Sequence, residues 1–412
     1  MMECLQVNKE RLQHSFIELE QFGKTAGGGI TRPALSLEDK LAREKLCEWM
    51  REAGLTVRVD DAGNYYGHRK GKNESLSPVV MGSHIDTVYH GGRFDGITGV
   101  QAALEVIRTW NDCNIETLRP VEMMVFTNEE GTRFEPSMLG SGVLAGVFDI
   151  EKVKKIKDMD GFSYGEELEK IGFNGTKENR LKEAHAYLEM HVEQGPVLDM
   201  RRTEIGVVKG IRGMLHLEIT IEGVKDHAGP SPMEYRKDAM MGACQIIAKM
   251  EEICKIIGHD TTITVGKIKC DPCSSNVIPK MVSFSVDVRN EEDMYMDQAR
   301  DAIKKLLHDT CEIKGLTYVF DEFWRVNAIH FPNRLVELVE ESTKKREYSY
   351  IPIVSGAGHD ASYMSSFIDT AMIFVPSIGG LSHCEEELSD YTQIAKGANV
   401  LSDTALILAN EM

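Results

Sequence analysis

The chain has 412 residues, more than one hydrophobic core usually supports, so we expect two domains. Its net charge of -18 argues against binding to nucleic acid or to anionic membranes and leaves a small molecule as the expected partner. No segment approaches the ~20 apolar residues of a membrane-spanning helix, and the N-terminal segment lacks a basic-then-apolar signal. The nine cysteines are irregularly spaced, as is typical of reduced thiols, so we expect a cytoplasmic protein.

The first half of the chain alternates strand-like and helix-like patterns. Ser36 and Asp39 form a capping-box signature that predicts the start of a helix. Residues 78–83 form an apolar run that predicts a strand, and residues 97–107 have apolar positions at helical spacing. We expect the charged segment 151–183 to form a helix or a loop on the surface. In open α/β sheets of this kind, ligands collect at the carboxyl ends of the strands.

Candidate metal ligands follow several of these predicted strands. They are His84 after residues 78–83, Asp95 in the glycine-rich turn 91–96, Glu129 and Glu130 after residues 121–128, His191 after residues 186–190, and His383 after residues 371–376 and a short loop. Strand alternation places Asp86 on the same face as His84, where its carboxylate would orient the imidazole. A single polar residue at a strand end is more often structural, but this recurrence favours one shared site. The ligand types suit two zinc-like ions about 3.5–4 Å apart.

The pattern changes near residue 210. Alternating apolar residues predict a strand at 215–221, and the following segments predict a helix at 237–257, strands at 262–268 and 281–288, a helix at 293–307 and a strand at 317–320. This β-α-β-β-α-β order predicts a ferredoxin-like domain. We therefore predict an α/β protein in which residues 1–210 and 329–412 form a mixed-sheet catalytic domain with helices on both faces. Residues 211–328 would be an inserted lid and dimerisation domain.

The motifs along the chain resemble those of one enzyme family. They are Gly82–Thr87, Gly91–Gly96, Asn128–Gly131, His191–Pro196, His227–Gly229, Asn276–Pro279, Ser355–Asp360 and Ser382–His383. In this order they resemble the N-carbamoyl-L-amino-acid amidohydrolases and allantoate amidohydrolases, a branch of the aminoacylase and carboxypeptidase superfamily of dinuclear metallohydrolases. The resemblance implies that the metal ligands are His84, Asp95, Glu130, His191 and His383. It also implies that Asp95 bridges the ions and that Glu129 is the general base.

The same resemblance implies a set of substrate contacts. His227 would polarise the scissile carbonyl from across a homodimer, and Asn276 and Arg289 would hold the substrate carboxylate, a task that suits the planar guanidinium. Gln194 and the backbone around Gly358 would line the carbamoyl end. Arg212 is a further candidate substrate contact, and His359 and Asp360 are expected to shape the site without binding metal.

We expect hydrolysis of N-carbamoyl-L-amino acids by metal-activated water, with two zinc or manganese ions per subunit, although cobalt and nickel are also compatible. Allantoate hydrolysis is the main alternative: segment 210–214 lacks the paired arginines of some allantoate enzymes, whereas segment 376–380 looks closer to them. A β-ureidopropionase is less expected. So is an aminopeptidase or dipeptidase, because segment 191–194 lacks the acidic ligand usual in related peptidases. Glu129, a non-ligand acid, disfavours a metal-binding protein without activity.

Two cysteines form the one further motif of note. Cys270 and Cys273 have C-x-x-C spacing, but without a second pair this is weak evidence for a metal site.

Overall fold

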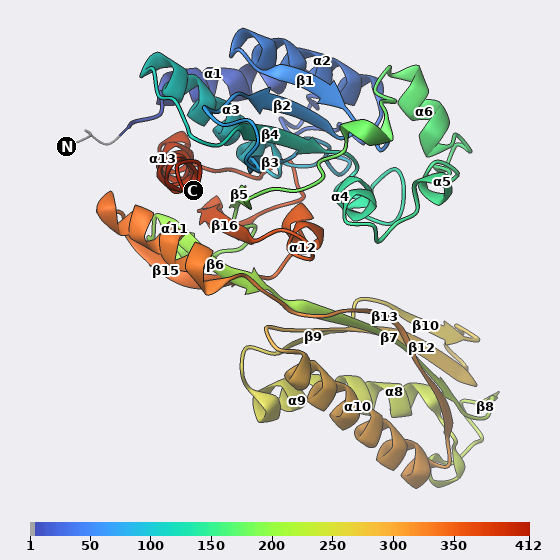
Figure 1. The fold of residues 1–412 in the computed structure, drawn as a ribbon. Coiled ribbons are helices and arrows are strands. Elements are labelled where there is room, and N and C mark those ends of the chain that lie inside the picture. Colours follow the sequence, from blue (N-terminus) through green and yellow to red (C-terminus); the bar gives the residue numbers. More distant parts are fainter. Residues whose placement is uncertain (1–4) are drawn as a thin grey trace. The chain divides into compact units, whose positions relative to one another are not determined.

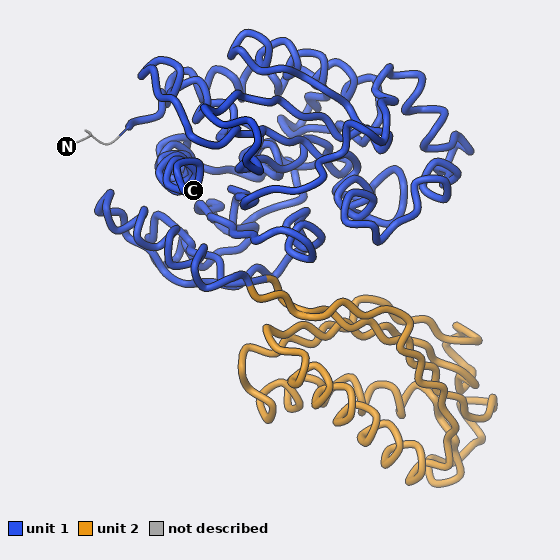
Figure 2. Tube along the Cα trace, viewed as in Figure 1, with its two compact units in different colours: residues 1–210, 331–412 blue, residues 211–330 orange. Residues whose placement is uncertain are grey.

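The computed structural model describes residues 5–412 (Figure 1). The chain forms two compact units (Figure 2). Unit 1 contains the chain up to Gly210 together with Phe331–Met412, and unit 2 contains Ile211–His330. Each unit has its own hydrophobic core. Of the helices in residues 5–412, none is both long enough and apolar enough to cross a bilayer.

Unit 1 is built on a nine-stranded sheet in the order β1-β2-β4-β3-β5-β16-β6-β14, with β15 paired to β6. The strands are β1 (Thr56–Val59), β2 (Tyr65–Arg69), β3 (Val79–His84), β4 (Val121–Phe126), β5 (Ala186–Val192), β6 (Ile205–Ile211), β14 (Ile329–His330), β15 (Tyr350–Ser355) and β16 (Thr370–Val375). The β3-β4, β3-β5 and β5-β16 pairs are parallel, whereas β1-β2, β2-β4 and β6-β16 are antiparallel. The predicted mixed α/β class is therefore confirmed.

The four central strands are buried along their whole length. Strands β3, β4, β5 and β16 consist mainly of apolar residues, as expected of strands that are covered on both faces. Because these strands run parallel, their carboxyl ends meet at one edge of the sheet. His84 ends β3 and His191 lies one residue before the end of β5, so the fold brings both imidazoles to that edge.

Helices cover both faces of the unit 1 sheet (Figure 1). They are α1 (Lys9–Leu19), α2 (Leu37–Glu52), α3 (Ile97–Asp112), α4 (Leu139–Leu144), α5 (Ile150–Val153), α6 (Tyr164–Lys170), α7 (Val197–Arg201), α11 (Asn333–Lys345), α12 (Asp360–Met364) and α13 (Tyr391–Leu408), with 3-10 turns η1 (Lys177–Asn179) and η3 (Ile378–Gly380). Helix α3 packs on β3 and β5, α13 packs on β16, and α12 packs on β16 from the opposite face. The side chain of Ser36 accepts from the Asp39 N–H at 3.1 Å, so the predicted helix start is confirmed.

Unit 2 contains a five-stranded antiparallel sheet in the order β10-β12-β7-β13, with β9 also paired to β12, and its helices lie on one face (Figure 1). The strands are β7 (Gly213–Glu222), β8 (Asp226–His227), β9 (Thr262–Thr264), β10 (Ile268–Asp271), β11 (Val277–Ile278), β12 (Met281–Asn290) and β13 (Thr317–Val326). The helices are α8 (Ala239–Ile247), α9 (Met250–Ile257) and α10 (Asp293–Lys314), with the 3-10 turn η2 (Met233–Tyr235). Alternate residues of β12 are buried against the helices, which gives this unit its core.

Two predicted elements of unit 2 are each divided in the structure. The predicted helix 237–257 is two helices, because the Lys249 N–H bonds to the Ile246 carbonyl at 3.1 Å in a tight turn between them. Buried Ile246, Met250 and Ile253 keep helical spacing across this break, so periodicity alone does not reveal it. The predicted strand 262–268 is divided because β9 and β10 pair with different parts of β12.

A buried arginine connects three parts of unit 1. Arg43, in α2, donates to the Asp39 carboxylate at 2.8 Å, to the Gly63 carbonyl at 2.8 Å and to the Thr127 hydroxyl at 3.1 Å. Both side chains of the Arg43–Asp39 pair are inaccessible to solvent. Thr127 directly follows β4, so this ion pair supports the segment that leads to Glu129.

Replacing Arg43 with methionine should therefore be strongly destabilising, because the buried Asp39 carboxylate would lose its ion-pair partner. We expect the free energy of unfolding to fall by about 3–5 kcal/mol, measured by urea denaturation of the metal-free protein. The matched control is Lys40→Met on the same helix. Lys40 forms an exposed pair with Glu44, and its loss should cost about 1 kcal/mol or less. Equal losses in the two variants would contradict this reading.

Candidate metal centre

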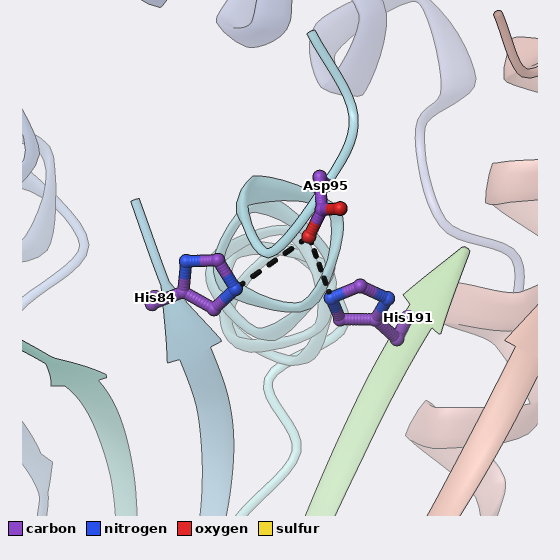
Figure 3. A group of neighbouring side chains, drawn as sticks. All are labelled: His84, Asp95 and His191. Atoms are coloured by element: carbon purple, nitrogen blue, oxygen red, sulfur yellow. Dashed lines mark ion pairs between the residues drawn. The ribbon is translucent and has the colours of Figure 1, made fainter. Parts of the chain in front are cut away.

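The candidate site centres on Asp95, which lies in the turn between β3 and α3. One carboxylate oxygen of Asp95 lies 3.6 Å from Nε2 of His84 and 3.2 Å from Nε2 of His191 (Figure 3). The other oxygen lies 3.4 Å from Nε2 of His383, which is also 3.4 Å from the Glu130 carboxylate. The possible ligand atoms of His84, Asp95 and His191 lie within 4.8 Å of one another, and so do those of Asp95, Glu130 and His383. Asp95 therefore belongs to both groups of donors. This is the geometry of a carboxylate that can bridge two cations.

The backbone fixes the orientation of the two buried imidazoles. Nδ1 of His84 lies 3.0 Å from the Asp86 carbonyl, and Nδ1 of His191 lies 2.8 Å from the Val192 carbonyl. A carbonyl only accepts hydrogen bonds, so Nδ1 carries the proton and Nε2 is directed toward Asp95. Gly96, with φ of 65°, leaves the necessary space, because a Cβ there would lie 2.3 Å from the His84 ring.

Asp86 contacts both His84 and the segment that carries Glu129 and Glu130. Its carboxylate lies 3.8 Å from Nδ1 of His84, and the Asp86 backbone carbonyl orients that ring. The carboxylate accepts the backbone N–H groups of Glu129 and Glu130, both at 3.2 Å. Asp86 therefore positions the two acids, and that its carboxylate also orients His84 stays a prediction.

Neighbouring polar groups hold the Asp95 turn in place. The Gln194 amide N–H donates to Asp95 at 2.7 Å, and the Ser382 hydroxyl lies 2.9 Å from both Asp95 and Glu387. Glu387 accepts the backbone N–H groups of Phe94 and Asp95 at 2.8 and 3.0 Å. Because Glu387 is buried beside Asp95, its pKa rises to about 7. The loop that carries His383 is thus joined to the turn that carries Asp95.

Glu129 lies next to both groups but belongs to neither. Its carboxylate is 3.7 Å from Nε2 of His84. Burial and the nearby Asp360 and Glu130 carboxylates raise the pKa of Glu129 well above its usual range. Burial together with Asp95 also raises the pKa of Glu130. The site therefore concentrates carboxyl groups whose ionisation requires positive charge nearby.

The donor set fits divalent cations. Burial lowers the pKa of His84 to about 4, which keeps this imidazole neutral and able to coordinate. Burial also lowers the pKa of His191, but the hydrogen bond and charge of Asp95 outweigh it and raise the pKa to about 9. Imidazole nitrogen and carboxylate oxygen suit zinc and manganese and also accept cobalt or nickel. Cations would offset the mutual repulsion of the buried acids.

Two buried acids near the centre were not identified from the sequence. One is Glu387, described above. The other, Glu189, accepts the Ser83 hydroxyl at 2.7 Å, the Tyr187 hydroxyl at 3.0 Å and the Ala361 N–H at 3.0 Å. An acid in the middle of the otherwise apolar β5 is the signal that could have revealed Glu189.

His359 lies beside the centre in a third group with Glu189 and His191. Its Nε2 is 2.9 Å from the Ser355 hydroxyl, and its ring centroid is 4.5 Å from that of His191. Because Glu189 already accepts three hydrogen bonds, this group is less suited to a metal than the two that share Asp95. That His359 and Asp360 shape the site without binding metal stays a prediction.

The proposed substrate contacts are divided between the units. Gln194 and Gly358 lie in unit 1, and Gln194 contacts Asp95 directly. His227 and Asn276 lie close together in unit 2, because β8 pairs with β11 and the Ala228 N–H donates to the Asn276 carbonyl at 3.0 Å. Unit 1 alone therefore assembles the predicted metal ligands, Asp86, Glu129 and Gln194.

Both predicted arginine contacts in unit 2 have acidic partners. The Arg289 guanidinium donates to the Asp287 carboxylate, with a shortest distance of 3.0 Å. Arg212 lies 3.6 Å from Glu291 and donates to the Asp260 carbonyl at 3.2 Å.

The family of the protein follows from comparison with known proteins. The model of peptidase family M20/M25/M40 matches residues 80–407, a range that contains all five predicted metal ligands. The chain belongs to this family. This M20 chain is 38% identical to an N-carbamoyl-L-amino-acid amidohydrolase of Rhizobium meliloti, over 98% of this chain and 97% of the relative. It is 33% identical to an allantoate amidohydrolase of Bacillus subtilis, over 95% of each chain.

A solved structure extends the likeness to the fold. The M20 chain matches an amidase of the hydantoinase/carbamoylase family from Burkholderia multivorans with a TM-score of 0.95 and 41% identity. The match covers 99% of this chain and 100% of the other. The resemblance inferred from the sequence motifs is confirmed.

Metal binding should depend on pH because the carboxyl ligands must lose protons. Below its raised pKa, Glu130 holds a proton that a cation has to displace, and below a pKa of about 9 the His191 imidazole holds one as well. Zinc or manganese should therefore raise the melting temperature of metal-free protein more at about pH 8 than at about pH 6. Calorimetry in buffers of different ionisation enthalpy should show proton release at the lower pH. Equal stabilisation at both pH values would contradict this expectation.

Proposed function

We propose that this protein is a metal-dependent amidohydrolase that cleaves the carbamoyl C–N bond of N-carbamoyl-L-amino acids. The observation that carries the proposal is the Asp95 carboxylate shared by two donor groups, with Glu129 beside them and outside both. A metal-binding protein without activity would not need this additional acid. The amidohydrolase names of the full-length relatives support the same reaction class.

In the proposed centre, one divalent ion is held by His84, Asp95 and His191, and a second by Asp95, Glu130 and His383. When bound, such ions polarise a carbonyl and lower the pKa of water. Zinc or manganese is the proposed metal, with cobalt or nickel as alternatives.

Glu129 is the proposed general base and acid. It would accept a proton from the water that attacks the carbamoyl carbon and return a proton to the leaving amino nitrogen. Its raised pKa suits a group that both accepts and donates protons during turnover. The reaction releases the amino acid and carbamate, which decomposes to ammonia and carbon dioxide.

Gln194 supports recognition of a carbamoyl group. Its amide nitrogen donates to Asp95, and its Oε1 atom is buried without a hydrogen-bond partner among residues 5–412. A carbamoyl end carries an NH₂ group that could donate to this oxygen, and pairing would remove the cost of an unsatisfied acceptor. A peptidase substrate is supported less well, because Glu193 accepts the Val197 and Leu198 N–H groups at the start of α7 and belongs to none of the donor groups.

Unit 2 is the proposed ferredoxin-like lid and dimerisation domain. Its sheet order and its helices on one face support this assignment. Arg289 and Asn276 would hold the substrate carboxylate, and Arg212 would be a further contact. His227, supplied by the partner subunit of a homodimer, would stabilise the developing oxyanion, a contribution of a few kcal/mol in comparable sites.

Allantoate is the second candidate substrate, supported by the relatives named for that activity. A direct comparison would use N-carbamoyl-L-amino acids, their neutral amides, allantoate, β-ureidopropionate and dipeptides, each with zinc, manganese, cobalt and nickel. We expect the highest kcat/KM for N-carbamoyl-L-amino acids and poor turnover of their amides, because a neutral amide cannot form the bidentate, charge-assisted contact with Arg289 that a carboxylate would form. A higher kcat/KM for allantoate would reassign the substrate. Equal turnover of the amides would refute the carboxylate clamp.

Replacing Glu129 with glutamine should abolish turnover without removing metal. The amide preserves the shape of the side chain but cannot shuttle protons, so we expect kcat to fall by about 10²–10⁴-fold. Metal content and kcat should be measured on the same preparation. Glu130→Gln is the matched variant and should lose metal. Loss of metal from the Glu129 variant would recast Glu129 as a ligand, and near-normal turnover would exclude it as the base.

The dimer model predicts complementation between two inactive variants. In a hybrid of Glu129→Gln and His227→Ala subunits, one site has both residues intact. Random exchange of equal amounts should restore about a quarter of the wild-type activity, because half of the dimers are hybrids with one intact site each. Subunit exchange should be confirmed by native mass spectrometry. No recovery after exchange would place His227 in its own subunit's site or outside the chemistry.

A further inference from the structure

A pair of thiols in unit 2 has no part in the proposed chemistry. Cys270 lies in β10 and Cys273 lies two residues past its end. Both are free, Cys270 is half-buried and Cys273 is exposed, and their side chains hydrogen-bond to each other. The pair belongs to none of the groups with three or more metal donors, which disfavours a metal site.

The loop that begins at Cys273 leads directly to Asn276. The Ser274 N–H bonds to the Pro272 carbonyl at 3.1 Å, and the Ser274 hydroxyl donates to the Asn276 side chain at 2.9 Å. The Asn276 carbonyl then accepts the Ala228 N–H, and Val277 pairs with His227. A change at Cys273 therefore reaches two proposed substrate contacts within a few residues.

We propose that Cys270 and Cys273 form a reversible intrachain disulfide that controls the loop carrying Asn276. The oxidant is a low-molecular-weight disulfide. The Cys273 thiolate attacks one sulfur of this disulfide and displaces a thiolate, and the Cys270 thiolate then attacks Sγ of Cys273 and displaces the second. Two protein thiols are oxidised, one disulfide is reduced to two thiols, and the protons pass to solvent. Disulfides of this kind in reducing compartments usually serve redox sensing.

The order of these steps follows from the surroundings of each thiol. Cys273 is exposed and is reached first by the oxidant. The hydrogen bond with Cys273 raises the pKa of the Cys270 thiol, which suits Cys270 as the second thiol to react. Accessible, adjacent thiols are the arrangement in which a first mixed disulfide is resolved within one chain.

Disulfide formation should displace the loop and leave the sheet in place. Cys270 is held opposite Val282 in the β10-β12 ladder, whereas Cys273 lies in the loop. The sulfurs must approach from hydrogen-bonding contact to a covalent bond of about 2 Å, so the loop has to adjust. The adjustment would move Asn276 and strain the β8-β11 pairing beside His227. The effect on Asn276 and His227 rests on the proposed function, whereas formation of the disulfide does not.

The first experiment tests the disulfide itself. The metal-loaded enzyme is equilibrated with mixtures of reduced and oxidised glutathione, alkylated and analysed by peptide mass spectrometry. We expect a peptide containing both cysteines that is lighter by two hydrogen atoms and resists alkylation, with reversal by dithiothreitol. Cys273→Ser should abolish it, and Cys244→Ser, an exposed cysteine elsewhere in unit 2, should not. Full alkylation of both thiols under oxidising conditions, or a disulfide only between chains, would overturn the proposal.

The second experiment tests control of the loop with two independent readouts. Oxidation should change hydrogen exchange in residues 226–230 and 274–279 and should lower kcat/KM by about 10- to 100-fold, with recovery on reduction. Cys273→Ser should retain full activity under oxidising conditions, whereas Cys244→Ser should lose activity as the wild type does. An enzyme inactive in both redox states would refute the proposed function, while hydrogen exchange would still test the loop. A disulfide without change in either readout would overturn control by this loop.

Discussion

The position of the Asp95 carboxylate is the constraint on which the rest of the site depends. One oxygen faces His84 and His191, and the other faces His383. Each direction is fixed by a different part of the chain, because the imidazoles come from β3, from β5 and from a loop after β16. A small movement of the turn would separate the two donor groups. The parallel strands and the start of α3 therefore together fix the position of the Asp95 side chain.

Burying several carboxylates close together is costly, and the fold distributes hydrogen-bond donors to make it tolerable. Asp86 and Glu387 each accept two backbone N–H groups, and Glu189 accepts one N–H and two hydroxyl groups. Burial raises the pKa of Glu129 and Glu130 well above the usual range, and that of Asp86 and Glu387 to about 7. The acids bonded by the backbone define the shape of the site, and Glu129 and Glu130 are available for protons and cations.

The sequence predicted the edge of the sheet at which the site lies, because buried parallel strands are continuous apolar runs and polar residues at their ends are conspicuous. It did not predict that Asp86 accepts the backbone N–H groups of Glu129 and Glu130. Two residues of separation suggested alternation along a strand, but β3 ends at His84 and the chain then turns. Glu387 was also missed, since the backbone N–H groups of Phe94 and Asp95 that it accepts lie nearly 300 residues away and local spacing carries no information about them. In unit 2, the breaks in the predicted helix and strand depend on tertiary pairing and on one tight turn, which hydrophobic periodicity does not register.

The two donor groups differ in their access to solvent, and this difference indicates how a substrate approaches. The side chains of His84, Asp95, His191 and Glu130 are at most 5% exposed, whereas the His383 side chain is 51% exposed. A molecule from solvent therefore meets the His383 side of Asp95 first. Glu129 lies on the buried side, 3.7 Å from His84. We infer that a carbonyl group enters beside the accessible His383 imidazole and then meets the largely buried Glu129, an arrangement that limits the access of bulk water to Glu129 once a substrate is bound.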